Sequence, residues 1–271
     1  MPELPEVETT RRGIEPHCKG HTLTELVVRQ PKLRWPVPVE MLKRLEGKVL
    51  HSVERRGKYL LMNFDDGAMV AHLGMSGSMR VLTEGAGPAA KHDHIDWIFD
   101  NGVVVRYTDP RRFGSLLWQP RGETIKLIET LGPEPLSDEF DAAYLHAQCK
   151  GRSIAIKQRI MDSHVVVGVG NIYANESLFF AGIDPRKPAG KVSKAKITLL
   201  VEHIKRVLAR AIEQGGTTLK DFVNSDGKPG YFAQSLSVYG RGGEPCHVCQ
   251  SVLKEIRMGQ RTTVYCPKCQ K

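Results

Sequence analysis

Four cysteines near the C-terminus have the spacing of a metal site. Cys246 and Cys249 form one Cys-x2-Cys pair, and Cys266 and Cys269 form a second pair after sixteen intervening residues. This spacing is typical of a four-thiolate zinc ribbon, and four sulfur ligands leave no open coordination position for catalysis. A segment of about 35 residues is too small for a stable apolar core of its own. We therefore expect one structural Zn²⁺ that holds the end of the chain together.

A glycine turn, Gly168-Val169-Gly170-Asn171, precedes a stretch with helical apolar spacing. Glycines let the backbone approach a ligand closely, and the N-terminus of a helix presents free N–H groups to an anion. The segment lacks the lysine and the serine or threonine of a nucleotide P-loop. The expected guest is therefore a nucleic-acid phosphate, and a plain tight turn between two helices is the alternative.

Two other turns carry side chains that could enter a stack of bases. The run 109–114 holds Arg111 and Phe113, and the run 72–77 holds Met75 at its tip. Apolar side chains on loops can act as wedges between bases. Side chains that fold back into the protein core are the alternative on local evidence.

The charge of the chain is uneven. The 271 residues have a net charge of +9, but residues 1–150 carry 20 basic and 21 acidic residues, and residues 151–271 carry 19 and nine. A basic half indicates a polyanionic partner, which is nucleic acid or a membrane surface. No apolar run reaches the roughly 18 residues of a membrane helix, and the acidic N-terminus is unlike a signal peptide. We expect an intracellular protein whose cysteines are thiols or metal ligands.

Hydrophobic spacing predicts a helix from Glu3 to about Glu15 that ends at Pro16. Short strand-like runs follow, separated by turn signals, and this pattern is typical of a sandwich or barrel. The runs are 22–29, 48–55, 59–64, 68–73, 78–82, 95–99, 103–107 and 115–118. After about residue 131, helical patterns follow at 138–149, 154–161, 172–181 and 193–214. A hairpin, 252–258 with 262–265, lies between the cysteine pairs.

Together these motifs resemble the formamidopyrimidine-DNA glycosylase family. The likeness rests on the opening Pro2-Glu3-Leu4-Pro5-Glu6-Val7-Glu8, the run 109–114, the glycine turn and the four-cysteine ribbon, which follow the family's order from end to end. It implies an α+β multidomain protein. An N-terminal β-sandwich with flanking helices would span 1–133, a helical domain with a helix–two-turns–helix motif 134–236, and a zinc ribbon 237–271.

The resemblance implies a bifunctional DNA repair enzyme. It would excise oxidised purines, 8-oxoguanine and formamidopyrimidines, from duplex DNA through a Schiff base, and then cleave the strand at the abasic site by β,δ-elimination. Its partner would be double-stranded DNA that contains oxidised purines or abasic sites, and the protein would be a bacterial, cytoplasmic monomer that does not bind membranes. An N-terminal amine suits this chemistry, because its pKa of about 7.7–8.0, against about 10.4 for lysine, leaves more of it neutral.

The resemblance also implies the catalytic residues. Pro2 would be the nucleophile after Met1 is removed, and Glu3 would protonate the sugar ring oxygen as the base leaves. Lys58 would contact phosphate and act in the elimination. Arg261, on the ribbon hairpin, would bind phosphates around the lesion and assist δ-elimination.

The residues that bind DNA follow in the same way. Met75, Arg111 and Phe113 would fill the gap left by the extruded nucleotide, with Arg111 facing the orphaned cytosine. The segment Thr217–Tyr239 would close over the flipped base. The remaining matched positions comprise phosphate and backbone contacts and two residues of that closing segment: His92, Arg152, Lys157, Asn171, Lys220 and Tyr239.

Two other functions compete with this interpretation. Endonuclease VIII uses the same proline chemistry on oxidised pyrimidines, but Leu4, Val7 and the set Met75, Arg111 and Phe113 favour the purine enzyme. A zinc-ribbon protein that only binds DNA would explain the charge, the glycine turn and the cysteines. Such a protein would not need the catalytic positions to match.

Overall fold

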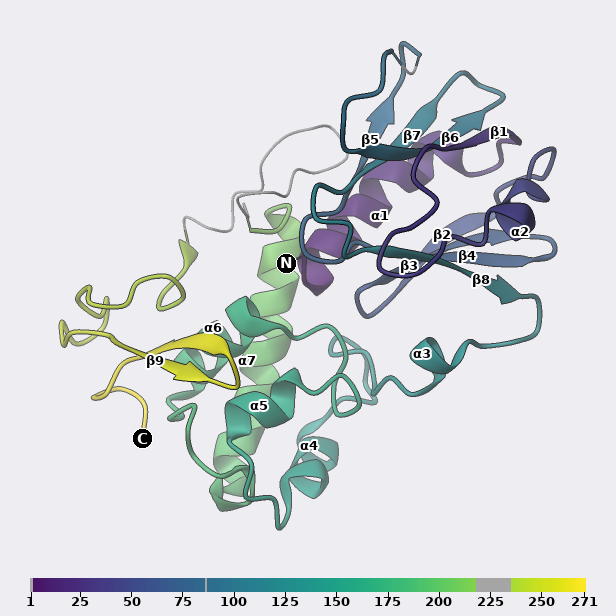
Figure 1. Cartoon of the computed structure of the whole chain (residues 1–271). Coiled ribbons are helices and arrows are strands. Elements are labelled where there is room, and N and C mark those ends of the chain that lie inside the picture. The colour runs from purple at the N-terminus through teal and green to yellow at the C-terminus, as the bar shows by residue number, and fades with distance from the viewer. Residues whose placement is uncertain (1, 86, 218–234) are drawn as a thin grey trace. The chain divides into compact units, whose positions relative to one another are not determined.

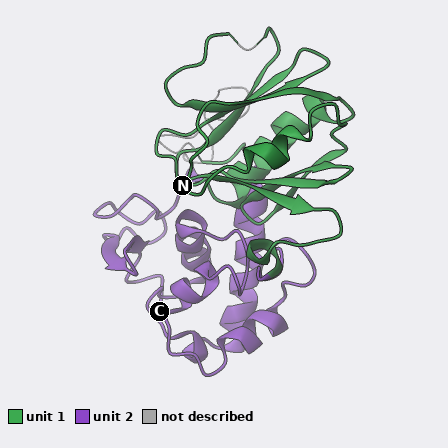
Figure 2. Ribbon diagram, turned by 45° about the vertical axis from the view of Figure 1, so that its right-hand side comes forward, with its two compact units in different colours: residues 1–129, 214–231 green, residues 130–213, 232–271 purple. Residues whose placement is uncertain are grey.

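The computed structural model of the chain describes residues 2–85, 87–217 and 235–271. The chain divides into two compact units (Figure 2). The first comprises residues 1–129 with 214–231, and the second comprises residues 130–213 with 232–271. Each unit is therefore built from two separate stretches of sequence.

The first unit is a β-sandwich with flanking helices (Figure 1). One antiparallel sheet has the strand order β1-β6-β7-β5, and the other has the order β2-β3-β4-β8. The strands are β1 (Leu23–Val28), β2 (Ser52–Arg56), β3 (Tyr59–Phe64), β4 (Gly67–His72), β5 (Ser78–Leu82), β6 (Asp93–Phe99), β7 (Val104–Thr108) and β8 (Ser115–Pro120). The helices are α1 (Leu4–Cys18), α2 (Val39–Lys43) and α3 (Lys126–Glu129).

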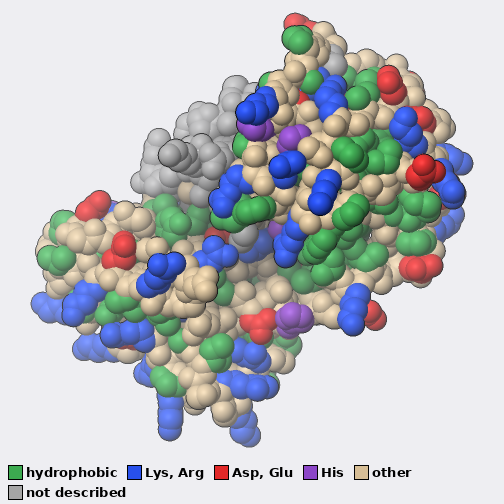
Figure 3. Space-filling view, in the orientation of Figure 1, with side chains coloured by type: hydrophobic (Ala, Val, Ile, Leu, Met, Phe, Trp, Pro, Cys, Tyr) green, Lys and Arg blue, Asp and Glu red, His purple; other side chains and the backbone are tan. Residues whose placement is uncertain are grey.

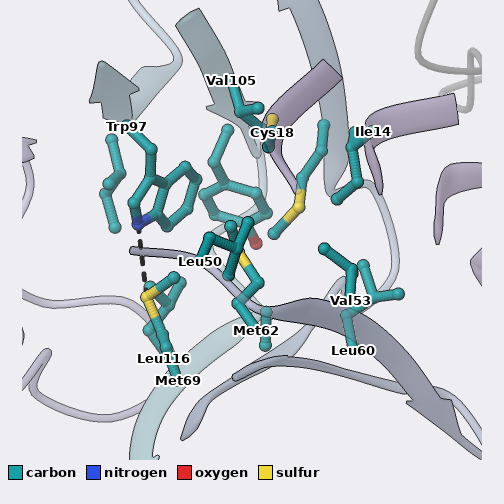
Figure 4. Close-up of a cluster of buried hydrophobic side chains, with 14 of the residues drawn as sticks. Ile14, Cys18, Leu50, Val53, Leu60, Met62, Met69, Trp97, Val105 and Leu116 are labelled. Atoms are coloured by element: carbon teal, nitrogen blue, oxygen red, sulfur yellow. Dashed lines mark hydrogen bonds between the residues drawn. The ribbon is translucent and has the colours of Figure 1, made fainter. Parts of the chain in front are cut away.

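An apolar core lies between the two sheets. Trp97 on β6 and Met69 on β4 are fully buried, and the indole N–H donates to the Met69 sulfur at 3.3 Å (Figure 4). Ile14 and Cys18 of α1 enter the same core, and α1 packs against β2 and β5. The start of the chain is therefore fixed to the sandwich by burial of one face of α1.

Strand β6 shows how alternation builds this sandwich. Trp97 faces the core, while Asp96 faces the other side of the sheet. There the Asp96 carboxylate accepts hydrogen bonds from Arg29 and Arg106 at 2.7 to 2.9 Å. A fully buried carboxylate is stable in this position because two guanidinium groups neutralise it.

The second unit consists of helices and a small hairpin (Figure 1). It contains α4 (Ala142–Cys149), α5 (Ile156–Met161), α6 (Asn171–Ala181), the 3-10 helix η1 (Ala189–Lys191), α7 (Lys194–Glu213), β9 (Lys254–Met258) and β10 (Arg261–Tyr265). Helix α7 buries a stripe that includes Ile197, Val201 and Ile204, against α6 and α4. The spacing of these residues is that of one helical face.

The predicted strands, the longer helices and the hairpin are all present, with ends shifted by up to four residues. The fold class is therefore confirmed. The prediction that Pro16 ends the first helix is wrong, because α1 continues to Cys18. A proline in the last turn removes one N–H donor, and Lys19 still donates to the Glu15 carbonyl at 2.9 Å. The short helices α2 and α3 have no apolar period long enough to predict.

Candidate functional site

The N-terminal proline and the acidic residues beside it are buried. Glu3 is 2% exposed and Glu6 is fully buried. Glu3 is the N-cap of α1, and its carboxylate accepts the Glu6 N–H, while the Glu6 carboxylate accepts the Glu3 N–H at 2.8 Å. The second Glu6 oxygen accepts the Thr217 N–H at 2.8 Å. This reciprocal cap fixes the backbone of Pro2 and Glu3, and it ties residue 217 to the same place.

Lys58 lies half-buried in the tight turn between β2 and β3. Its charge acts on His72, the last residue of β4. Burial, together with the positive charges of Lys58 and Arg34, lowers the pKa of His72 to about 4. The neutral imidazole accepts the Gly74 N–H at Nδ1 over 3.0 Å and lies 4.9 Å from the Tyr59 ring. His72 thus joins the turn of Lys58 to the loop that carries Met75.

The structure brings the candidate wedge residues together at one end of the sandwich. The Arg111 guanidinium lies over the Phe113 ring, 4.8 Å from its centroid, and Phe113 is 45% exposed. The Arg111 N–H donates to the hydroxyl of Ser76, the residue after Met75, at 3.2 Å. The backbone of His92 joins the same group, because its carbonyl accepts the Asp109 N–H at 3.0 Å. An exposed Phe113 does not fit the alternative of side chains folded into the core.

In the second unit, Lys157 lies at the centre of a different cluster. Its side chain is 1% exposed, and its ammonium donates to the Asn171 amide oxygen at 2.7 Å and to the Thr263 hydroxyl at 2.6 Å. Lys157 and the Asn171 amide also donate to the Thr262 carbonyl, at 3.2 and 3.0 Å. Arg261 directly precedes this pair of threonines and is exposed. Asn171 and Arg261 are therefore near neighbours, and a direct DNA contact by Lys157 stays a prediction.

A second buried carboxylate organises the entry to the ribbon. Glu176 of α6 is 1% exposed and accepts the backbone N–H groups of Ser237, Val238 and Tyr239 at 2.8 to 2.9 Å. Burial raises the pKa of Glu176, although the three N–H donors oppose this shift. The backbone of Tyr239 is thus fixed to α6. Lys220 lies outside the described residues.

Arg152 lies exposed in the turn before α5, where its carbonyl accepts the Gly190 N–H at 2.8 Å. Lys and Arg side chains are spread over the visible face of the second unit, with few Asp and Glu among them (Figure 3). This agrees with the basic balance of residues 151–271. Across the described residues, no helix has both the length and the apolar character that crossing a bilayer requires.

The four C-terminal cysteines converge. Their sulfur atoms all lie within 4.8 Å of one another, and the sulfurs of Cys249 and Cys266 are 3.4 Å apart. Cys246 and Cys266 are fully buried against a small apolar cluster that includes Phe179. Four thiolates at this separation fit tetrahedral Zn²⁺ and leave no position for substrate.

Comparison with known proteins identifies the family to which this chain is similar. The chain matches the formamidopyrimidine-DNA glycosylase N-terminal domain over residues 1–116, the formamidopyrimidine-DNA glycosylase H2TH domain over 131–223, and a zinc finger found in FPG and IleRS over 243–271. The formamidopyrimidine-DNA glycosylase of Stutzerimonas stutzeri is 58% identical over 271 residues and is covered completely, as is this chain. The chain belongs to the formamidopyrimidine-DNA glycosylase family.

Solved structures agree with this family assignment. The MutM (Fpg) protein of Thermus thermophilus has a TM-score of 0.89 and 38% identity, covering 99% of this chain and 98% of its own. The Lactococcus lactis Fpg in complex with DNA that contains an abasic site has a TM-score of 0.91 and 34% identity, covering both chains fully. Members of this family are DNA glycosylases that repair oxidised purines and have AP lyase activity. The resemblance is confirmed, the enzyme class and one structural zinc follow, and the two alternative functions fall away.

Several residues that shape these sites were not found by sequence reasoning. They are His72, Ser76, Asp109 and Glu176. Glu176 had a signal, since it is an acidic residue inside an otherwise apolar helix, which marks a buried group that needs donors. Asp109 had a weaker one, as an acidic residue directly after an apolar strand. Ser76, Asp109 and Glu176 depend on partners that are at least 33 residues away in sequence.

Proposed function

We propose that this chain excises oxidised purines from double-stranded DNA with Pro2 as its nucleophile. The observation that carries the proposal is the buried Pro2-Glu3 pair at the start of α1, whose backbone the Glu6 carboxylate fixes at 2.8 Å. A nucleophile and an acid on adjacent residues can reach adjacent atoms of one sugar. A secondary amine in this position becomes available once Met1 is removed.

In the first step, the Pro2 nitrogen lone pair bonds to C1′ of the damaged nucleotide. The C1′–N bond to the base breaks, and the base leaves with the bonding electrons. The Pro2 nitrogen passes its N–H proton to the departing base. Glu3 donates a proton to the sugar ring oxygen, the C1′–O4′ bond breaks, and the nitrogen lone pair forms the C=N bond of a Schiff base between Pro2 and C1′.

In the second step, loss of a proton from C2′ breaks the C3′–O bond and releases one phosphate. Loss of the C4′ proton in a further elimination breaks the C5′–O bond and releases the other phosphate. Lys58 and Arg261 bind these phosphates as charge collects on them, because a cation stabilises a departing anion.

The duplex binds through phosphate contacts from Arg152, Asn171 and His92. Lys157 is buried with its ammonium on the Asn171 amide oxygen, so we propose that its predicted DNA contact is made through Asn171 rather than directly. The DNA complexes of the Lactococcus lactis relatives, with abasic-site and Fapy-dG DNA, support a partner of this kind. Sequence-independent phosphate binding predicts affinity that falls steeply with salt.

Met75, Arg111 and Phe113 fill the space that the extruded nucleotide leaves, with Arg111 facing the orphaned cytosine. Extrusion costs a few kcal/mol of unstacking, which such wedges offset. From the family resemblance we also propose that Lys220 and Tyr239 contact the flipped base.

Cys246, Cys249, Cys266 and Cys269 would hold one Zn²⁺, which would supply a structural crosslink of the ribbon that carries Arg261 and no catalytic chemistry.

We propose that residues 1–133, 134–236 and 237–271 are the three functional modules. The protein would be a monomer that acts in the bacterial cytoplasm on nucleoid DNA.

A strand-cleavage assay on two duplexes tests this function. One duplex holds 8-oxoguanine opposite cytosine, the other an oxidised pyrimidine, and mass spectrometry first verifies a free N-terminal proline. We expect excision and β,δ-cleavage of the first duplex, and much slower reaction of the second. Preferential cleavage of the pyrimidine duplex would contradict the proposal.

A further inference from the structure

A buried carboxylate lies beneath the wedge loops. Asp109 follows β7 and is fully buried. Its Oδ1 accepts the Ser76 hydroxyl proton at 2.7 Å, and its Oδ2 accepts the Tyr107 hydroxyl at 2.9 Å and the Gly114 N–H at 2.9 Å. Its carbonyl accepts the His94 ring at 2.8 Å. Three donors from three positions thus converge on one side chain.

These hydrogen bonds reach the neighbours of every wedge residue. Ser76 follows Met75, and its hydroxyl accepts the Arg111 N–H while it donates to Asp109. Gly114 directly follows Phe113. Because each partner is adjacent to a wedge residue or bonded to its backbone, the carboxylate links both loops at their bases.

The loops also lie too close together to adjust independently. A Cβ at Gly74 would overlap the backbone of Phe113 and Gly114, and a Cβ at Gly114 would overlap the Tyr107 hydroxyl. Between the wedge residues, Arg112 has a φ of 56°, in the left-handed region that non-glycine residues rarely adopt. The Asp109–Gly114 hydrogen bond closes the loop around this strained residue.

The Tyr107 hydroxyl remains protonated and can donate to Asp109. Burial raises the pKa of Tyr107 well above its usual value, and the neighbouring Asp109 charge raises it further. Tyr107 therefore keeps its proton throughout the neutral range and donates to the carboxylate. An O–H or N–H that donates to a carboxylate makes a stronger bond than a neutral pair.

We propose that Asp109 is a positioning residue that presets Met75, Arg111 and Phe113 as one rigid unit before DNA binds. It rests on the proposed function of those three side chains. Asp109 touches no reacting atom, and it acts on the choice of the opposite base and on DNA affinity through Arg111. Preorganisation of this kind reduces the ordering cost of binding.

The test compares Asp109→Asn and Ser76→Ala with Ser78→Ala, a matched control at another buried serine two residues along the same segment. The readout is cleavage of 8-oxoguanine opposite cytosine relative to adenine, with kcat and KM measured separately. We expect the two variants to lose discrimination by about tenfold, the order of one base contact. The loss should come mainly from KM, and Ser78→Ala should keep the wild-type ratio.

A merely structural role predicts something different. It would lower the thermal midpoint and both cleavage rates in proportion, leaving the cytosine-to-adenine ratio unchanged, and that result would overturn the proposal. If Asp109 acts through Arg111, Asp109→Asn should have no further effect on the ratio in an Arg111→Ala background. Additive losses in the double variant would also overturn it.

The Arg111→Ala single variant separates the positioning role of Asp109 from the wedge function proposed for Arg111. If Arg111→Ala itself leaves the ratio unchanged, the assigned wedge function is wrong. If Arg111→Ala lowers the ratio and Asp109→Asn does not, the wedge function stands and only the positioning role of Asp109 is wrong.

Discussion

The N-terminal sandwich and the C-terminal ribbon both carry residues of the proposed reaction. The two regions differ in the interactions that hold those residues in place. Pro2 and Glu3 stand at the start of a helix that packs into the core between two sheets. Arg261 stands on a two-stranded hairpin whose small apolar cluster consists partly of cysteines. Packing in the sandwich therefore sets the position of Pro2, the proposed nucleophile, whereas the position of Arg261 depends on the zinc site and on the hydrogen bonds of the neighbouring threonines. The two contributions can be removed separately.

The largest expected effect is on chemistry in the sandwich. Glu3→Gln should lower base excision by about 10³-fold, within the usual range for a general acid, while DNA affinity changes little. Single-turnover excision of 8-oxoguanine and the Kd for the same duplex measure the two quantities. The exposed Glu25 on β1 provides a matched control as Glu25→Gln. Loss of binding by Glu3→Gln would make Glu3 a structural residue.

Removal of zinc should affect the C-terminal ribbon and leave the sandwich folded. Chelation, or Cys249→Ser, should unfold the ribbon and weaken DNA binding by about 100-fold as its phosphate contacts are lost. All three tryptophans, Trp35, Trp97 and Trp118, lie in the first unit, so their fluorescence reports on the sandwich alone. We expect that signal to persist and added Zn²⁺ to restore binding. A zinc-free protein that still folds fully and cleaves DNA would refute the metal's role.

A smaller effect distinguishes direct from indirect phosphate binding in the second unit. Arg261→Ala should weaken DNA binding and reduce the slope of log Kd against log salt by about one. Lys157→Met should weaken binding by about tenfold, the value of a charged hydrogen bond, and leave the slope unchanged. The reason is that the Lys157 ammonium is buried against Asn171 and Thr263. A slope reduced equally by both variants would mean that Lys157 contacts phosphate itself.

The smallest effect concerns the stability of the sandwich in acid. Burial raises the pKa of Glu8, but hydrogen bonds from Arg11 and Arg12 and the charges of Arg11 and Arg55 outweigh it and lower the pKa to about 2. The stabilisation is therefore present above the ordinary pKa and is lost as the pH falls toward 2. Glu8→Gln should cost about 1–2 kcal/mol of unfolding free energy at pH 7, after screening of a partly solvated network.

Urea unfolding followed by tryptophan fluorescence at several pH values measures this difference. The wild-type and Glu8→Gln curves should converge as the pH falls from about 5 toward 2, since protonation removes the same charge. A constant gap over that range would place the effect of Glu8 outside its ionisation.

Local patterns predicted most of the elements of this fold. Alternation identified the strands, and the Cys-x2-Cys spacing identified the ribbon, because both signals lie within a few residues of sequence. The end of α1 was missed, since the prediction rested on Pro16 alone and the helix tolerates a proline in its last turn. The strand order β1-β6-β7-β5 joins segments far apart in sequence, which no local pattern contains.

The residues of the candidate site also fall into two groups, those that short motifs predict and those that only the fold brings together. Pro2, Glu3 and the cysteines stand in short motifs that the family resemblance covers. The surroundings of Lys157 could not be read from sequence, because its partner Thr263 is 106 residues away. The convergence of Ser76 and Asp109 is likewise a product of the fold, over a separation of 33 residues.

The central claim is that Pro2 forms a covalent intermediate with the sugar. Borohydride reduction during turnover on a duplex with 8-oxoguanine opposite cytosine tests this most directly, since it converts a Schiff base into a stable adduct. We predict one protein–DNA adduct that maps by peptide mass to Pro2, formed by the wild type and abolished when Met1 is retained. A protein with a verified free Pro2 that cleaves this duplex without an adduct, or with an adduct on a lysine, would contradict the account.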